Sequence, residues 1–363
     1  MSGQTRRRYL DWARGIAVLL MVQAHTFDAW TAPAVRAGAA FREATILGGF
    51  AAPLFLLLAG LGTSLSSERR LRATGGRSAA VEAACRRGAE IFGLAFLFRL
   101  QAFVVTPGSP LVALLRVDIL NVMGPAIIVA GLLWGLGRTP SQRAIICGAA
   151  ACAVSMVTPI MRFLPLVDSF PIWMQWYFRP AGNQSMFPLF PWAGFVLAGT
   201  AVGALVAAAR DRQIHRRVNI GLLLVGLFVV AVGFSTASLP SIYRQSSFWT
   251  SSPTYFAIRV GVIMSGLALL AGAEPLAEHL GVALEPLQRL GRNSLFVYWI
   301  HVELVYGYAT WILRRRLPFP AVSVAFLAFL SGLYALVLLK ERLMTAWRGG
   351  PELASPGASA VGR

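Results

Sequence analysis

The sequence predicts an all-α fold: a polytopic integral membrane helix bundle with about ten transmembrane helices. The first observation is composition, because 56% of the 363 residues are hydrophobic and only 13% are charged, with a mean hydropathy of +0.64. Soluble domains hold roughly 45–50% apolar and about 25% charged residues, so the surplus must face lipid. The second is length, because the apolar segments reach about 17–23 residues, enough to cross ~30 Å of hydrocarbon.

Ten such segments follow one another along the chain. Lipid offers no hydrogen-bond partners to an open backbone, and no segment alternates as barrel strands do, so all ten are predicted helices. We expect a single domain over residues 1–345 and a disordered cytoplasmic tail over residues 346–363. The predicted spans are residues 10–28, 45–66, 88–106, 117–136, 144–161, 187–208, 219–238, 254–273, 293–312 and 320–340.

The basic residues predict the orientation of these spans. The chain has 33 Lys+Arg against 15 Asp+Glu, a formal charge of +18 that on a soluble domain would favour nucleic acid. With the N-terminus inside, 21 basic residues fall in inner segments and 9 in outer ones, which favours two cytoplasmic termini. The outer cluster Arg314–Arg316 violates this rule. The expected partner is therefore the lipid bilayer, with no nucleic acid, and the expected location is the bacterial inner membrane.

Several familiar signatures are missing. Residues 5–10 resemble a twin-arginine export signal, but Asp11 and Arg14 interrupt the apolar stretch and no small-residue cleavage site follows. We interpret this segment as a retained first helix. The three cysteines lack metal-ligand spacing, and the chain has no Walker, HExxH or G-x-S-x-G sequence. We therefore expect no metal and no tightly bound cofactor.

The first span is the richest in polar residues. An ionisable residue inside the bilayer costs at least ~2.5–3.5 kcal/mol, so each is a functional candidate. Four of them share about a 100° arc of one helix face: Asp11, Arg14, His25 and Asp28. A rise of about 22 Å from Leu10 places His25 in the outer half of the membrane. We expect burial to keep His25 neutral and Asp28 to fix its tautomer, as a general base requires; alternatively, His25 only bonds a neighbouring helix.

The ninth span repeats this pattern. Ser294, Tyr298 and His301 are spaced i, i+4 and i+7 and share one face. A polar stripe with an intramembrane histidine is typical of a substrate cavity. A hydrogen-bond network between helices explains the spacing equally well.

Two arginines and a polar pair complete the candidates. Arg99 and Arg259 lie deep within their spans, where an arginine either pairs with a buried carboxylate or holds an anionic ligand. Asp118 and Asn121 lie near the outer end of the fourth span. They contact substrate on one interpretation and are simply hydrated on the other.

Four short motifs resemble those of a known family. Leu10–His25 resembles the first-helix motif of polytopic membrane acyltransferases, in which Asp-x-x-Arg-Gly opens the helix and a polar residue stands fourteen positions after the Asp. Ala52–Gly60 resembles the second-helix motif, and Phe187–Gly194 and Leu290–His301 resemble later ones. Their order over most of the chain is similar to that in bacterial relatives of heparan-alpha-glucosaminide N-acetyltransferase, which are related to the acyltransferase-3 group.

The resemblance implies transmembrane acyl transfer, with acetyl-CoA as a cytoplasmic co-substrate and an extracytoplasmic sugar amine or hydroxyl as acceptor. His25 stands where the acyltransferase-3 pattern has its histidine. The pattern of the heparan enzyme differs, with Asn at this position and a histidine in the next outer loop. Here the equivalent of that histidine is Arg36, and the next histidine is His215. Direct transfer with His25 as base therefore fits better than a covalent acetyl-histidine.

These expectations assign roles to particular residues. His25, Asp28 and His301 are the predicted catalytic residues, and Arg14, Arg69, Arg70 and Arg99 are expected to bind CoA. The expected substrate contacts are Asp118, Asn121, Trp192, Asn293, Ser294 and Tyr298. We expect Tyr298, Asn293 or His301 to stabilise the oxyanion.

The competing interpretation is a transporter or flippase that uses the intramembrane His, Asp and Arg as a proton or anion relay. Ten spans suit it as well, whereas the paired, unwound helices typical of transporters are not evident in the sequence. A third interpretation, a scaffold subunit, fits the polar first helix least. The oligomeric state stays open, with a homodimer among the alternatives.

Overall fold

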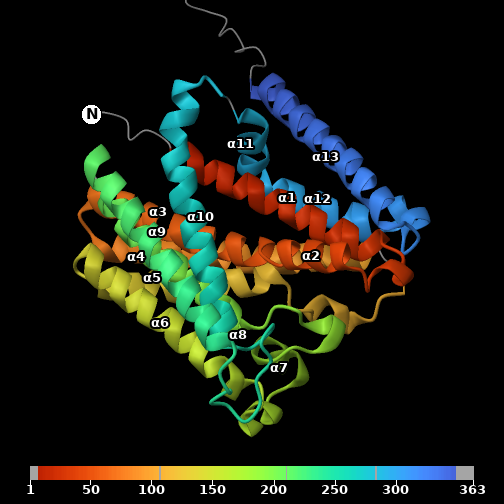
Figure 1. Ribbon diagram of the computed structural model, residues 1–363, viewed down its shortest axis with the longest axis horizontal. Coiled ribbons are helices and arrows are strands. Elements are labelled where there is room, and N and C mark those ends of the chain that lie inside the picture. The colour runs from red at the N-terminus through yellow and green to blue at the C-terminus, as the bar shows by residue number, and fades with distance from the viewer. Residues whose placement is uncertain (1–6, 106–107, 210, 283, 349–363) are drawn as a thin grey trace, which may run out of the picture.

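The computed structural model describes residues 7–105, 108–209, 211–282 and 284–348, and over these residues the fold is helical (Figure 1). Two isolated β-bridges are the only pairing between extended segments in these ranges. The described part of the chain forms thirteen α-helices: α1 (Arg8–Trp30), α2 (Ala39–Gly48), α3 (Ala51–Thr74), α4 (Arg77–Val105), α5 (Ile119–Leu136), α6 (Pro140–Met161), α7 (Ile172–Phe178), α8 (Leu189–Ala208), α9 (Arg212–Ala237), α10 (Pro253–His279), α11 (Glu285–Arg292), α12 (Ser294–Tyr306) and α13 (Phe319–Arg348).

Eight segments of the described chain are long and apolar enough to cross a membrane, and they coincide with eight of the ten predicted spans. They are the joined α2–α3 segment together with α4, α5, α6, α8, α9, α10 and α13. The other two predicted spans, 10–28 and 293–312, form α1, which is too polar, and α12, which has 13 residues. A count of ten spans is therefore not confirmed, and the orientation of the termini stays a prediction.

Two predicted boundaries differ from the structure. Residues 45–66 are not one helix, because the chain breaks at Gly49 and Phe50 between α2 and α3. Helix α13 continues to Arg348, so it includes the first residues of the predicted tail 346–363. The tail beyond this helix lies outside the described residues.

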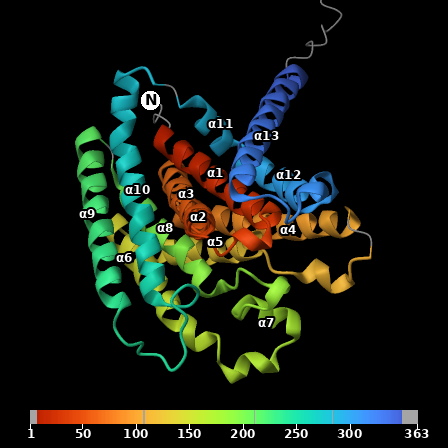
Figure 2. The same cartoon turned by 45° about the vertical axis from the view of Figure 1, so that its right-hand side comes forward.

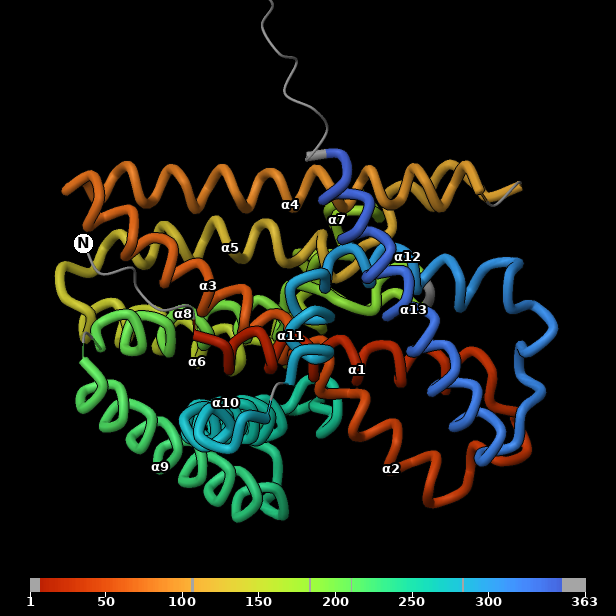
Figure 3. The backbone as a smooth tube through the Cα atoms, turned by 90° about the horizontal axis from the view of Figure 1, so that it is seen from above, coloured from red at the N-terminus to blue at the C-terminus, as the bar shows by residue number. Residues whose placement is uncertain are grey.

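Helix α1 lies at the centre of the bundle. It contacts α2, α3, α10, α11, α12 and α13. In Figures 1 and 2 it lies between α9 and α10 on one side and α13 on the other. Figure 3 shows α4 and α5 along one edge of the molecule and α9 and α10 along the opposite edge. Surrounded in this way, α1 can keep Asp11, Gln23 and Thr26 buried.

The four sequence motifs lie on helices that pack in pairs through glycines. A Cβ on Gly291 of α11 would meet the Asp11 carbonyl oxygen of α1 at 2.1 Å, and a Cβ on Gly15 would meet the Leu287 carbonyl oxygen at 2.2 Å. The first and last motifs therefore hold two backbones in direct contact, which only glycine permits. Gly60 of α3 makes the same kind of approach to α8.

The turn after α12 is attached to the end of α1. The backbone N–H of Arg315 donates to the Ala29 carbonyl at 3.0 Å, and those of Arg316 and Leu317 donate to the Trp30 carbonyl. Arg315 adopts a left-handed conformation with φ 55° to make this turn. Arginines here lie beside the C-terminal, negative end of the α1 dipole, which favours them locally. This placement accounts for a cluster that violates the arginine distribution.

Candidate functional site

A cavity of about 2360 Å³ runs through the bundle and is lined by α1, α2, α3, α4, α5, α8, α10 and α12. The α4 side chains along it extend from Ala80 to Ala102, about 33 Å of helix at 1.5 Å per residue. One end of the cavity, here the Arg69 end, is lined by Arg69, Arg70 and Arg87. The opposite end, here the His25 end, contains His25.

A histidine dyad forms part of the wall at the His25 end. The Nδ1 atom of His25 on α1 lies 2.8 Å from Nε2 of His301 on α12, and the two rings stack with centroids 5.0 Å apart. His301 is fully buried, whereas His25 lines the cavity. The structure therefore brings together two histidines separated by 276 residues, each of which the sequence nominated on its own.

The hydrogen bonds of the dyad determine the tautomer of both rings. Nδ1 of His301 lies 2.8 Å from the Val297 carbonyl oxygen, which can only accept, so this nitrogen carries the proton. In a neutral His301 the Nε2 atom is then bare and accepts a hydrogen bond from Nδ1–H of His25. A neutral His25 is left with its lone pair on Nε2. That is the form a general base needs.

An ion pair lies next to the dyad. Arg99 of α4 contacts Asp118 at 2.6 Å, and the Tyr298 hydroxyl donates to the same carboxylate at 3.0 Å. Asp118 also caps α5 in a reciprocal capping box with Asn121. Of the two interpretations of Arg99, the carboxylate partner is confirmed. Asp118 is thus part of a network joining α4, α5 and α12, and is not merely hydrated.

The predicted contact between Asp28 and His25 is not the one that the structure shows. Asp28 pairs with Arg36 at 3.6 Å and accepts a hydrogen bond from Tyr306 at 3.1 Å, while His301 takes the Nδ1 position of His25. The helical spacing was correct, but α1 ends at Trp30 and the Asp28 side chain is 63% exposed. We correct the tautomer-fixing role from Asp28 to His301.

The four arginines expected to bind CoA do not lie together. Arg69 and Arg70 lie at the Arg69 end, and Arg14 lines the cavity while paired with Asp11 at 3.0 Å. Arg99 is different, because it follows Arg77, the first residue of α4, by 22 positions, about 33 Å along the helix. Its guanidinium binds Asp118 next to the dyad, far from the Arg69 end, and its expected contact with CoA stays a prediction.

The expected substrate contacts divide into two groups. Trp192, Ser294, Tyr298 and Asp118 line the cavity. Asn121 is fully buried in the capping box, and Asn293 lies outside the cavity lining, where Lys340 and Glu341 of α13 bind its amide group. The donors of the three expected oxyanion contacts already have partners. The Tyr298 hydroxyl donates to Asp118, the Asn293 amide donates to Glu341, and Nδ1–H of His301 donates to the Val297 carbonyl.

Sequence patterns missed some residues at this end. The Tyr306 ring lies 5.6 Å from that of His25, and Arg116 and Arg162 line the same end of the cavity. Tyr306 lies on the same helix as His301, but an exposed aromatic near a helix end carries no signal of its own. Arg116 and Arg162 lie in loop positions that the sequence treats as outer flanks of the spans.

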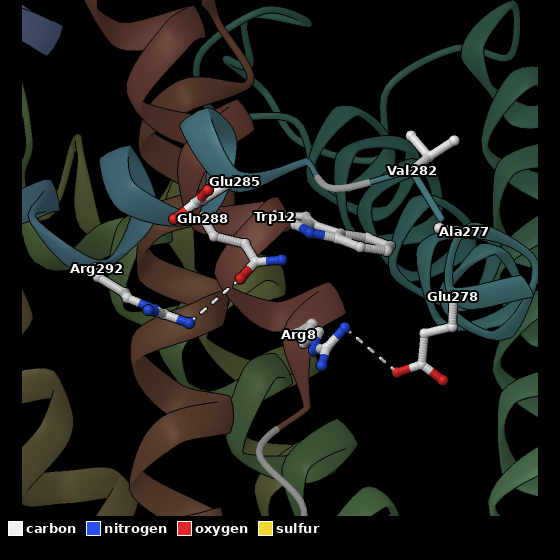
Figure 4. A pocket seen from close by; sticks show the side chains of 8 residues that line it. All are labelled: Arg8, Trp12, Ala277, Glu278, Val282, Glu285, Gln288 and Arg292. Atoms are coloured by element: carbon white, nitrogen blue, oxygen red, sulfur yellow. Dashed lines mark hydrogen bonds and ion pairs between the residues drawn. The ribbon is translucent and has the colours of Figure 1, made fainter. Parts of the chain in front are cut away.

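A second, smaller pocket of about 280 Å³ lies where the start of α1 meets α10 and α11 (Figure 4). In its wall Arg8 pairs with Glu278 at 3.6 Å, and Arg292 donates to the neutral amide of Gln288 at 3.2 Å. The pocket joins three helices through these pairs. The other charges of the wall are balanced from outside it, because Arg292 pairs with Asp11 at 3.5 Å and Glu285 with Arg289 at 2.6 Å.

Membrane-length helices around a cavity with a histidine dyad in its wall define a multi-pass integral membrane protein with an internal site. A family model described as heparan-alpha-glucosaminide N-acetyltransferase, catalytic, matches residues 6–229. This is more than half of the chain, so the protein belongs to that family of membrane acetyltransferases, which confirms the resemblance. No curated protein matches the chain. The matched residues include His25 and end before His301.

Proposed function

We propose that the protein transfers an acetyl (acyl) group from cytoplasmic acyl-CoA to a sugar amine or hydroxyl on the opposite side of the membrane, with His25 as general base. The observation that carries this proposal is the dyad on the wall of a cavity whose other end holds Arg69, Arg70 and Arg87. Guanidinium groups bind phosphates bidentately, which suits the nucleotide end of CoA. The cavity links such a site to His25 through the bundle.

The chemistry then follows from the tautomers. The bare Nε2 of His25 accepts the proton of the acceptor amine or hydroxyl while its nitrogen or oxygen attacks the thioester carbonyl carbon. The C–S bond breaks as the new C–N or C–O bond forms. The CoA thiolate leaves and is protonated by the His25 imidazolium, which restores the neutral dyad. No acyl-enzyme is needed, because the acceptor itself is the nucleophile.

The test is His25→Ala. We expect about a 10²–10⁴-fold loss of labelled acetyl transfer from acetyl-CoA to membrane glycans, lipids or amines, since that is the usual contribution of a general base. Purified protein in detergent or liposomes, followed by identification of the labelled product, gives the rate and the acceptor class. The matched control is His279→Ala, which removes an exposed histidine at the end of α10.

Two outcomes would contradict the proposal. Wild-type turnover by His25→Ala with normal expression would exclude His25 as the general base. Absence of thermal stabilisation by CoA or any acyl-CoA would favour the transporter interpretation instead. Loss of CoA stabilisation in Arg69→Gln/Arg70→Gln, with the dyad intact, would support the assignment of the Arg69 end to the nucleotide.

A further inference from the structure

The His25 end of the cavity carries more positive than negative charge. Three carboxylates line it: Asp28, Asp118 and Glu303. Seven arginines line the same end: Arg36, Arg42, Arg99, Arg116, Arg162, Arg259 and Arg314. Two of the arginines are neutralised, because Arg36 pairs with Asp28 and Arg99 pairs with Asp118.

Three of the remaining arginines are half-buried: Arg116, Arg162 and Arg259. Within the described ranges none of the three has a carboxylate within 4 Å, and the Nε atom of each is buried without a hydrogen-bond partner. Burial lowers the pKa of Arg116 and Arg162, and for Arg116 the nearby Arg99 lowers it further while the Asp118 carboxylate partly opposes the shift. Each guanidinium is therefore held where water stabilises its charge poorly.

Arg162 and Arg259 are held by one short segment of the chain. Arg162 donates to the hydroxyl and the carbonyl of Thr250 at 2.9 and 2.6 Å. Arg259 donates to the Tyr255 hydroxyl at 2.9 Å and lies 4.0 Å over the ring of that tyrosine. Figures 1 and 2 show the loop before α10 at the same end of the bundle as α7.

This segment lies close to the dyad. A Cβ on Gly49 would lie 3.5 Å from Nη2 of Arg259, and one on the preceding Gly48 would lie 2.8 Å from the Cβ of Ala24, the residue before His25. Arg116 stands on another wall, next to Asp118 of the dyad network. Arg259 therefore lies near the part of α1 that carries His25, and Arg116 and Arg162 line the same cavity.

We propose that Arg116, Arg162 and Arg259 form an anion-binding subsite for the acceptor, which therefore carries a phosphate or carboxylate near the amine or hydroxyl that is acetylated. The inference rests on the proposed function, and it names the acceptor class. Guanidinium groups with free N–H donors bind these two groups bidentately. A neutral acceptor would leave three half-buried cations without a counter-charge.

The test compares two probes, glucosamine and glucosamine 6-phosphate, binding to purified protein in phosphatidylcholine nanodiscs. We expect the phosphate to tighten binding at least about 10-fold, and Arg162→Gln or Arg259→Gln each to weaken binding of the phosphorylated probe about 10-fold, or about 1.4 kcal/mol. Binding of glucosamine should change little. Arg42→Gln is the matched control, because it removes an exposed arginine from the same cavity.

Equal affinity for the two probes, or no binding of either, would overturn the subsite. The same measurement with phosphatidylglycerol in the nanodisc distinguishes a lipid headgroup as occupant: if this lipid abolishes binding of glucosamine 6-phosphate, the assignment to an acceptor is overturned. Thermal unfolding checks that the variants fold. Repeating the binding in His25→Ala separates the two proposals, because binding there supports the subsite whether or not acetyl transfer is observed in the wild type.

Discussion

Two close ion pairs of similar geometry, both partly shielded from solvent, have different surroundings. Arg143 of α6 contacts Glu68 of α3 at 2.5 Å and stacks 4.0 Å over the Trp134 ring, and neither charged residue lines the cavity. Arg99 contacts Asp118 at 2.6 Å, but this pair faces the cavity and continues through Tyr298 toward the histidine dyad. A close ion pair therefore does not mark a functional site by itself. We regard an ion pair as a candidate for a functional role when it is connected to a titratable group and accessible from a cavity.

The largest expected effect is on the Glu68 pair, and it concerns stability alone. Glu68→Ala leaves the buried guanidinium of Arg143 without this carboxylate, which should lower the free energy of unfolding by about 3–5 kcal/mol. Thermal unfolding in detergent measures the loss. Acetyl transfer per folded molecule should be unchanged.

A double variant provides the control for that result. Glu68→Leu/Arg143→Leu removes both charges, so it should recover most of the lost stability. If Glu68→Ala instead reduced transfer at unchanged stability, the distinction between the two pairs would be wrong.

The next effect is on the dyad. His301→Asn retains a polar atom near the Nδ1 position but leaves Nδ1 of His25 unpaired, and we expect about a 10²-fold lower kcat. His301→Gln places an oxygen near the Nε2 position, where it accepts from His25, so it should recover much of the rate. Steady-state kinetics of the two variants test a positioning role. If His301 were purely structural, His301→Gln would not be expected to have a higher kcat than His301→Asn.

The smallest effect is on the link between pair and dyad. Tyr298→Phe removes the hydroxyl that donates to Asp118 and leaves the Arg99 pair in place. We expect a cost of about 1.5 kcal/mol, or at most about a 10-fold lower kcat. Measuring kcat of Tyr298→Phe and His301→Asn under the same conditions ranks the contribution of the hydroxyl of Tyr298 against that of the imidazole of His301. An effect larger than that of His301→Asn would place Asp118 nearer to the chemistry than His25.

The sequence predicted the helical membrane fold because hydropathy acts locally. Eight spans follow from length and composition alone, and α1 and α12 fall short of the same criterion because α1 carries several charged residues and α12 has only 13 residues. The break between α2 and α3 was not predicted, since Gly49 and Phe50 lie within a continuous apolar run.

The site was predicted only one helix at a time. The spacing nominated His25 and His301 separately, but their contact depends on tertiary packing between α1 and α12, which helical periodicity does not contain. Asp28 was assigned to His25 because the nearest polar residue on one helix is the only partner that periodicity can propose. For the same reason Arg99 was grouped with other arginines, although its partner, Asp118, lies on the next helix.

The distance along the chain between the two histidines has a consequence for biosynthesis. Chains emerge N-terminus first at about 5–20 residues per second, so the 276 residues between His25 and His301 take roughly 14–55 s to synthesise. For most of that interval α1 lacks its α11 packing surface, and throughout it α1 lacks the turn that binds its last carbonyls. The histidine dyad is therefore assembled late, and under the proposed mechanism we expect a ribosome-bound chain lacking α12 to be inactive however well its first helices have inserted.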